Sequence, residues 1–288
     1  TYSHGAGALA AAVGGPVLLT GEYVLPSDTA NEIARLGATR VFVMGPTSVI
    51  SNDVRRRAAL FVDGWSHTKR IPGTGTVDGA IQAARETKAR LAARGRVGDG
   101  TVVLVRGNGW ADAMIATPLA AKNNWPLLTA EWGSAGHLTR RVKSALAEMG
   151  ARRIILIGRT RDIPAGVTSD LNSLYGSSKV VRIGGSTASN LSINLAYWST
   201  LYANLRWDHM AIAPTGYYTE AVSAAWLEGN SGAPLLWSYP TILRERLRNT
   251  VLDNRETIAD LRMFTGNGTF FDPLVWTGIS SALYLGYF

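Results

Sequence analysis

The chain contains no cysteine and no long hydrophobic run, and each absence excludes a class of protein. Without cysteine there can be no disulfide bond and no thiolate metal site, although exported and cytosolic bacterial proteins can both lack this residue. No apolar stretch approaches the roughly 20 residues that a membrane-spanning helix needs. Of the 288 residues, 46% are hydrophobic and 17% are charged, so the chain can form folded cores and is not a disordered tail.

Lysine is also scarce, since only five of the 29 basic residues are lysines and 24 are arginines. The net charge is 0 over residues 1–68, +9 over residues 69–180 and −1 over residues 181–288. Arginine is suited to binding phosphate or carboxylate groups, which points to an anionic ligand on the middle part. A solvated basic surface without a ligand is the alternative. No nucleic-acid-binding motif accompanies the charge, so nucleic acid is not an expected partner.

Motifs for catalysis, metal binding and nucleotide binding are missing. The four histidines fall at positions without metal-ligand spacing. The turn Gly229–Gly232 resembles the one around a serine-protease nucleophile, but the other repeats have ordinary turns at this position. Gly107 and Gly109 precede a predicted helix whose N-terminus could bind phosphate, yet Asp112 in its first turn is expected to cap the helix instead. We therefore expect no catalytic residue, no metal ion and no cofactor.

A strand–helix–strand unit recurs along the chain. It is clearest in residues 101–130, where an apolar strand, a glycine turn and an alanine-rich helix lead to a second apolar segment. The proline of that segment, Pro126, has counterparts 110 residues before it, at Pro16, and 108 residues after it, at Pro234. Strands that alternate with helices predict parallel sheets with right-handed crossovers.

The predicted fold is α/β, with three tandem modules of parallel sheet packed as one compact body. Their predicted ranges are 1–68, 69–180 and 181–288. The first module holds only a C-terminal half, because no strand precedes its helix at 3–14. An upstream part was removed, or a second copy or another chain completes the sheet; the start at Thr1 and the lack of a visible signal peptide favour trimming. Strands are expected at 16–20, 40–44, 101–105, 125–129, 153–157, 180–183, 209–213, 234–237 and 261–265. Further helices are expected at 27–36, 51–61, 77–93, 111–122, 138–149, 164–174, 189–204, 219–228 and 241–253. A turn at 266–268 precedes a final helix from 272 onward.

Short motifs recur in the same order in the three modules. They are RIPG (70–73) and RIGG (182–185), GWADAM (109–114), PVLLT (16–20), PLLT (126–129), PLLW (234–237), LGATRVFVMG (36–45), MGARRIILIG (149–158) and IADLRMFTG (258–266). Through these motifs nearly the whole chain resembles the bacterial cell wall-binding repeat family, type 2. The resemblance implies three Rossmann-like modules that pack as a triangle. The third module departs from the family pattern at Glu220, where the family has aspartate.

The family resemblance also implies a function, which is non-catalytic anchoring to an anionic secondary polymer of the Gram-positive cell wall. The protein would then act outside the cell, at the wall surface. The positions proposed to contact the polymer are Pro16, Leu18 and Leu19, Pro126, Leu127 and Leu128, Pro234, Leu235 and Leu236, together with Arg70, Arg106 and Arg182. The proline–leucine–leucine segments have a second interpretation as core strands, because central parallel strands are apolar in any case. Trp110, Trp125 and Trp132 could stack on sugars, although core packing is the first expectation.

Two other functions are compatible with the same sequence. The modules could be assembly units of a surface layer or of a virion or tail, in which neighbouring chains complete the first module and contact the aromatic C-terminus at 284–288. The third candidate is an α/β enzyme acting on a nucleotide or phosphosugar. It ranks last, because such an enzyme needs a paired acid and base at one crevice. The sequence offers only Asp112 and the residues that take its position in the other repeats.

Overall fold

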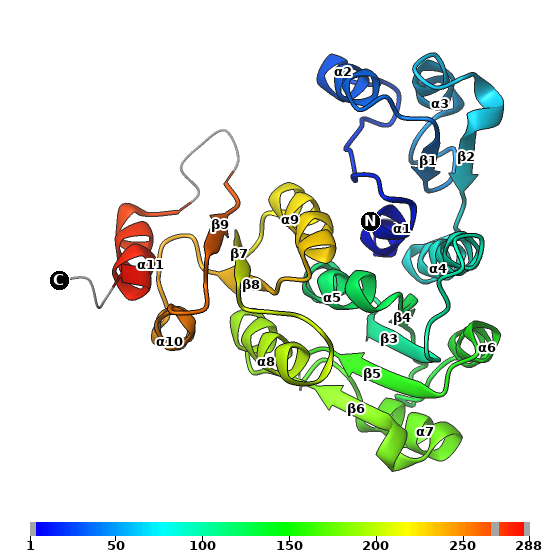
Figure 1. Ribbon diagram of the computed structural model, residues 1–288. Helices are drawn as coiled ribbons and strands as arrows, with labels where there is room; N and C mark the ends of the chain where they lie inside the picture. Colours follow the sequence, from blue (N-terminus) through cyan, green and yellow to red (C-terminus); the bar gives the residue numbers. More distant parts are fainter. Residues whose placement is uncertain (1–3, 160, 266–270, 285–288) are drawn as a thin grey trace.

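The computed structural model describes residues 4–159, 161–265 and 271–284. Strands and helices alternate along these residues and form three parallel sheets, which confirms the predicted α/β fold class. The strand orders are β1-β2, β4-β3-β5-β6 and β8-β7-β9 (Figure 1). The predicted turn at 266–268 and residues 285–288 of the aromatic C-terminus lie outside the described residues.

The middle sheet is covered by helices on both faces, which explains why its central strands are apolar along nearly their whole length. Its strands are β3 (Thr101–Arg106), β4 (Leu127–Ala130), β5 (Arg153–Ile157) and β6 (Val180–Ile183). One face packs on α4 (Thr76–Ala92), α6 (Arg140–Met149) and α7 (Ala165–Tyr175), and the other on α5 (Trp110–Asn123) and α8 (Ala188–Tyr202). Side chains of β3 alternate between the two cores, with Val102 and Leu104 in one and Val103 and Val105 in the other.

The third sheet repeats this arrangement. It consists of β7 (His209–Pro214), β8 (Leu235–Ser238) and β9 (Asp260–Met263), with α9 (Tyr218–Ser231) on one face and α10 (Glu245–Asn254) and α11 (Pro273–Tyr284) on the other. Helix α8 joins the two units, because Leu191 and Leu195 pack in the core shared with the middle sheet while Ile193 and Ala196 pack in the core of the third.

The first sheet has two strands, and this overturns one sequence prediction. Its elements are α1 (Ala6–Val13), α2 (Ser27–Arg35), β1 (Val41–Met44), α3 (Asn52–Ala59), the 3-10 turn η1 (Trp65–His67) and β2 (Thr68–Ile71). The prediction of a buried strand at 16–20 is wrong, since this segment is not a strand and Leu19 is 40% exposed. The corresponding strands β4 and β8 are held by pairing with the central strands β3 and β7. Among the described residues no strand precedes α1, so residues 16–20 have no such partner.

The sheets also cross the predicted module boundaries. Strand β2 pairs in parallel with β1, and β6 pairs in parallel with β5. The strands expected to open the second and third modules therefore complete the sheets of the preceding ones. A boundary placed after residue 68 or 180 cuts each of these strands, although the division into three repeating units stays a prediction.

Helices α1, α5 and α9 pack against one another at the centre, with one sheet outside each (Figure 1). All three end in a residue with positive φ at equivalent positions: Gly14 at 72°, Asn124 at 58° and Gly232 at 74°. The helices approach closely because small residues line their contacts. A Cβ added to Gly229 of α9 would lie 2.8 Å from the Cβ of Ala121 in α5.

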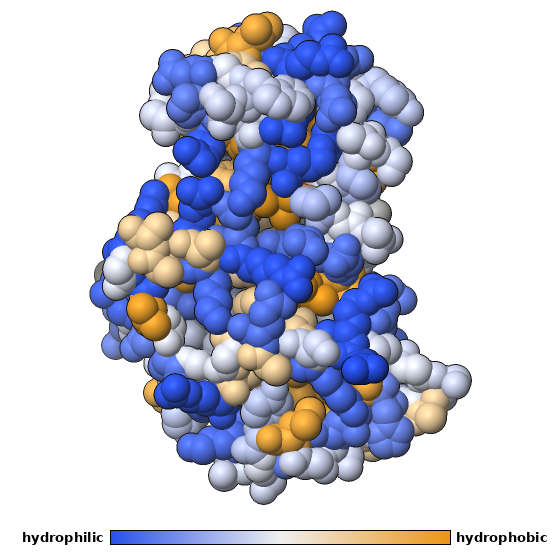
Figure 2. All heavy atoms as spheres, turned by 90° about the vertical axis from the view of Figure 1, so that its right-hand side faces the viewer, coloured by the Kyte–Doolittle hydropathy of each residue, from blue (hydrophilic) through white to orange (hydrophobic). Residues whose placement is uncertain are grey.

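Figure 2 shows the side of the molecule that carries α3, α4 and α6, which is mostly hydrophilic with small separate hydrophobic areas. The molecule narrows below the upper lobe, which contains α2 and α3. No helix within the described parts of the chain combines the length and apolar character needed to cross a membrane.

Candidate functional site

The leucines of the proline–leucine–leucine segments lie mostly in the core. The exposed fractions are 1% for Leu127, 1% for Leu128, 2% for Leu235 and 0% for Leu236, and the prolines before them are also buried. These side chains form the strands β4 and β8 and offer no surface to a polymer in this structure. In the first module Pro16 and Leu18 are half-buried and Leu19 is exposed.

Arg70 and Arg182 occupy equivalent positions on the edge strands β2 and β6. Arg70 donates hydrogen bonds to the carbonyl oxygens of Gly45 (2.8 Å) and Ser51 (3.3 Å). Arg182 donates to the hydroxyl of Thr168 (2.8 Å) and to the carbonyl oxygen of Ile163 (3.3 Å). Each arginine thus ties an edge strand to the start of the helix packed beside it. Burial lowers the pKa of both guanidinium groups, which nevertheless stay charged at neutral pH.

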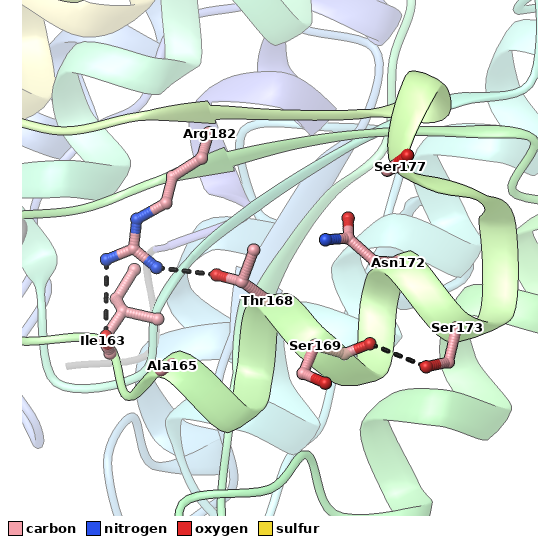
Figure 3. A pocket seen from close by; sticks show the side chains of 8 residues that line it. All are labelled: Ile163, Ala165, Thr168, Ser169, Asn172, Ser173, Ser177 and Arg182. Atoms are coloured by element: carbon pink, nitrogen blue, oxygen red, sulfur yellow. Dashed lines mark hydrogen bonds between the residues drawn. The ribbon is translucent and has the colours of Figure 1, made fainter.

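Arg182 lies at the edge of a surface hollow with a volume of about 760 Å³ (Figure 3). The hollow is formed between α7, β6 and the 3-10 turn η2 (Ser177–Lys179). Its lining side chains are Ile163, Ala165, Thr168, Ser169, Asn172, Ser173, Ser177 and Arg182. Hydroxyl and amide groups can bind sugar hydroxyls, and the guanidinium can bind an anion. None of the described residues that line this hollow carries a carboxylate that would repel such a group.

Arg106 stands at a different place, the carboxyl end of β3. The chain leaves β3 toward β4 and leaves β5 toward β6, so the ends of β3 and β5 flank the topological switch point of the middle sheet. There the guanidinium of Arg106 lies 2.9 Å from the carboxylate of Asp162 and 3.4 Å from that of Asp112. Asp162 also pairs with Arg159. The charge of Arg106 is therefore largely balanced by acidic neighbours, and the structure does not bring the three predicted arginines together.

Asp112 lies in the first turn of α5, as predicted, but its Oδ2 accepts no hydrogen bond from the backbone N–H groups of the helix. The residue is 2% exposed, its Oδ2 has no hydrogen-bond partner, and its nearest cation is Arg106. Burial raises the pKa of the Asp112 carboxyl to about 6, while the charge of Arg106 opposes this rise. The Asp112 Oδ2 lies close to Arg106 and also to Gly109, the N-cap residue of α5, since a Cβ added to Gly109 would lie 2.7 Å from it.

The hydroxyl groups of α7 are the functional candidates that the sequence reasoning missed. The polar side chains of this helix that line the hollow form two pairs, each spaced by one helical turn: Thr168 with Asn172, and Ser169 with Ser173. The signal was present as a polar stripe at helical spacing, but such stripes are common on solvated helix faces. Only the position of Arg182 opposite the stripe distinguishes this one.

The tryptophans mainly support packing. Trp125 is 5% exposed and lies in the core, while Trp132 packs against the core of the middle module. Trp110 is half-buried and makes edge-to-face contacts with Tyr218 and Trp237 across the junction of the second and third modules. Among the residues that the structure describes, no group of three or more histidine or acidic side chains could hold a metal ion.

Two curated proteins resemble this chain, and in each the similarity covers only part of the relative's length. The chain is 25% identical over 186 residues to the N-acetylmuramoyl-L-alanine amidase LytC of Bacillus subtilis, covering 64% of this chain and 34% of the relative. It is 24% identical over 230 residues to the amidase enhancer of the same organism, covering 80% of this chain and 28% of the relative. The chain thus spans about a third or less of the curated relatives that it matches.

Two solved structures share the fold over 98% of this chain. They are Cwp6 from Clostridium difficile, with a TM-score of 0.81, 18% identity and 42% of that chain covered, and Cwp8 from the same organism, with a TM-score of 0.77, 20% identity and 46% covered. Residues 70–168 match the family model of cell wall binding domain 2. The resemblance seen in the repeated motifs is therefore confirmed over residues 70–168, the part of the chain that matches the cell wall binding domain 2 (CWB2) family.

Proposed function

We propose that this protein attaches non-covalently to an anionic secondary polymer of the bacterial cell wall, without catalysing a reaction on it. The hollow beside Arg182 carries the proposal, because it combines one guanidinium with hydroxyl and amide groups and has no carboxylate in its lining. All of its lining residues except Arg182 fall within residues 69–180, which have a net charge of +9 and contain the residues matched by the cell wall binding family. The protein would act at the wall surface.

Binding would combine long-range and short-range contributions. The positive field of the middle module attracts the polymer and orients it. Arg182 then contacts an anionic group, while Thr168, Asn172 and Ser177 exchange hydrogen bonds with sugar hydroxyls. Because part of the attraction is between exposed charges, affinity should fall as salt concentration rises.

The test is sedimentation with purified Gram-positive walls, with and without their secondary polymers, across a salt series. The proposal expects binding that disappears with the polymer and weakens with salt. Equal binding to stripped walls would contradict recognition of an anionic polymer. Large particles that ignore walls would favour the assembly function instead.

A matched pair of variants tests the hollow itself. Ser173→Asp places a negative charge in the hollow, and Ser223→Asp places the same charge on α9. Both serines are exposed, and each hydroxyl donates to the carbonyl oxygen four residues earlier on its helix. A like charge at about 4 Å costs about 1 kcal/mol in water, so Ser173→Asp should weaken binding about fivefold. Equal effects of the two variants would place the polymer elsewhere.

A further inference from the structure

The surface around Arg70 in the first module corresponds to the hollow around Arg182. The two strand pairs have the same register, since Arg70 pairs with Val43 and Arg182 pairs with Leu156, each one position before the end of its strand. The backbone N–H of the following glycine, Gly45 or Gly158, then donates to the last residue of the edge strand. The 3-10 turns η1 and η2 also precede β2 and β6 in the same way.

The side chains at this surface differ between the two modules. Where the middle module has Ser177 at the start of η2, the first module has Trp65 at the start of η1, and this tryptophan is 45% exposed. Helix α7 brings Thr168 to Arg182, whereas α3 brings a second arginine, Arg55, near Arg70. The first module therefore replaces a hydroxyl-rich surface by a cationic and aromatic one.

Arg55 is held in a defined position by three contacts. Its Nε donates to the hydroxyl of Thr68 (2.7 Å), and its Nη2 donates to the carbonyl oxygen of the same residue (2.6 Å). Its guanidinium plane stacks on Trp65, with 3.7 Å between the guanidinium carbon and the ring centroid. These contacts use two of its N–H groups and leave others, including both on Nη1, for a ligand.

Arg55 and Arg70 are two like charges without a carboxylate partner among the described residues. Their hydrogen bonds go to carbonyl, hydroxyl and amide oxygens only. The neighbouring carboxylate, Asp53, pairs with Arg56 at 2.7 Å instead. Burial lowers the pKa of Arg70, and the nearby charge of Arg55 lowers it further, as expected for two cations that repel each other. An anion placed between them would remove this repulsion.

We propose that Arg55 and Arg70 form a second anion-binding subsite, equivalent in position to the Arg182 hollow, which takes an oxyanion group of the wall polymer. Trp65 holds Arg55 in place and presents the rest of its ring to the adjoining sugar. This inference rests on the proposed function and extends it from one contact to two. A polymer long enough to reach both modules would then bind with higher affinity than either subsite gives alone.

Adjacent arginines of α3 supply the test. Arg55→Gln and Arg56→Gln remove the same charge from neighbouring positions, but Arg56 belongs to the exposed pair with Asp53. Arg55→Gln should weaken binding to polymer-bearing walls about tenfold, the effect of losing a hydrogen bond to a charged group, while Arg56→Gln should change it little. Arg55→Lys, which keeps the charge but loses the planar fork, should lie between them. Thermal melting of each variant checks that the fold is retained.

A second measurement uses inorganic sulfate and needs no wall. In the full chain labelled with 15N-arginine, sulfate should shift the Nε–H resonance of Arg55, assigned from Arg55→Lys, and leave that of Arg56 in place. If Arg55→Gln and Arg56→Gln bind walls equally, the subsite is overturned while wall attachment stands. If the protein ignores walls but sulfate shifts Arg55 selectively, the anion site stands and the proposed function falls. If sulfate shifts both resonances equally or neither, no built anion site exists and the inference is overturned.

Discussion

Gly7 of α1 packs directly against Thr117 of α5, at a contact between two helices from different predicted repeats. A Cβ added to Gly7 would lie 2.4 Å from the Cγ2 of Thr117, closer than side chains can approach. Thr117 itself is fully buried, and its hydroxyl donates to the carbonyl oxygen of Ala113. The threonine therefore cannot rotate away without leaving a buried hydroxyl unpaired.

Substitution of Gly7 should consequently weaken the fold. Gly7→Ala forces the helices apart, and overpacking of this kind costs about 1–3 kcal/mol of unfolding free energy. Gly133→Ala is the control, because nothing lies within 4 Å of an added Cβ there. Urea denaturation followed by circular dichroism measures both variants. Equal stability of the two would mean that the central helices can separate at little cost.

The buried Asp112 should make stability depend on pH. Its pKa is about 6 in the folded protein, above the usual 3.8, so the folded state binds this proton more tightly than the unfolded state does. The resulting stabilisation is complete below the unfolded pKa and is lost as pH rises through about 6. Relative to Asp112→Asn, the wild type should lose about 2 kcal/mol of unfolding free energy between pH 4 and pH 7. The charged groups around Asp112 are Arg106, Arg159 and Asp162.

Comparison with the variant is essential because another buried group titrates in the same range. Burial lowers the pKa of His4 to about 4, so its contribution has the opposite sign and is lost as pH falls. His4 is present in both proteins, so its effect cancels in the difference. A pH-independent difference between wild type and Asp112→Asn, measured by urea denaturation at each pH, would contradict the burial of an ionised Asp112.

In the third module the buried Glu228 forms an ion pair with the half-buried Arg262. Glu228 is 0% exposed, its Oε1 accepts a hydrogen bond from Arg262 Nη1 at 3.0 Å, and burial raises the pKa of its carboxyl. Arg262→Met leaves this carboxylate without a cation, which should cost about 3–5 kcal/mol in denaturant titrations. The double variant Glu228→Gln/Arg262→Met should recover part of that loss.

An exposed pair supplies the control for this experiment. Arg255 lies 3.5 Å from Glu256, whose side chain is 88% exposed. Arg255→Met should therefore change the unfolding free energy by less than about 1 kcal/mol. If Arg255→Met lowered the unfolding free energy as much as Arg262→Met does, the loss in Arg262→Met would reflect general surface charge rather than the pairing of Arg262 with Glu228.

Residues 16–20 should exchange their amide hydrogens faster than the corresponding strands. Strands β4 and β8 hydrogen-bond to central strands, whereas the segment 16–20 pairs with none of the described strands. In hydrogen exchange followed by mass spectrometry, peptides covering 16–20 should exchange well before those covering 127–130 and 235–238. Equal protection would show that another segment pairs with residues 16–20 in solution.

Much of this architecture follows from the sequence alone. The apolar run at 101–105 and the alanine-rich helix after it predict β3 and α5 because backbone propensity and side-chain period are local properties. Recurrence of Pro16, Pro126 and Pro234 at nearly equal spacing predicts the repeat. The same local reasoning fails at 16–20, since an apolar segment becomes a strand only when another strand is available to pair with it.

Only the tertiary structure decides which residues face a ligand. Leu127 and Leu235 are buried because helices cover both faces of their sheets, and nothing in the motif itself distinguishes a core strand from a contact strand. Arg106 and Arg182 look alike as strand arginines, but Asp162 balances the first while α7 places hydroxyl groups beside the second. The pairing of β2 with the preceding sheet likewise brings Arg70 to α3 and Arg55. Contacts of this kind join segments that lie far apart in the chain. Local sequence therefore determines the helices and strands and their order, whereas the packing of those elements determines the exposure and the charged neighbours of each side chain.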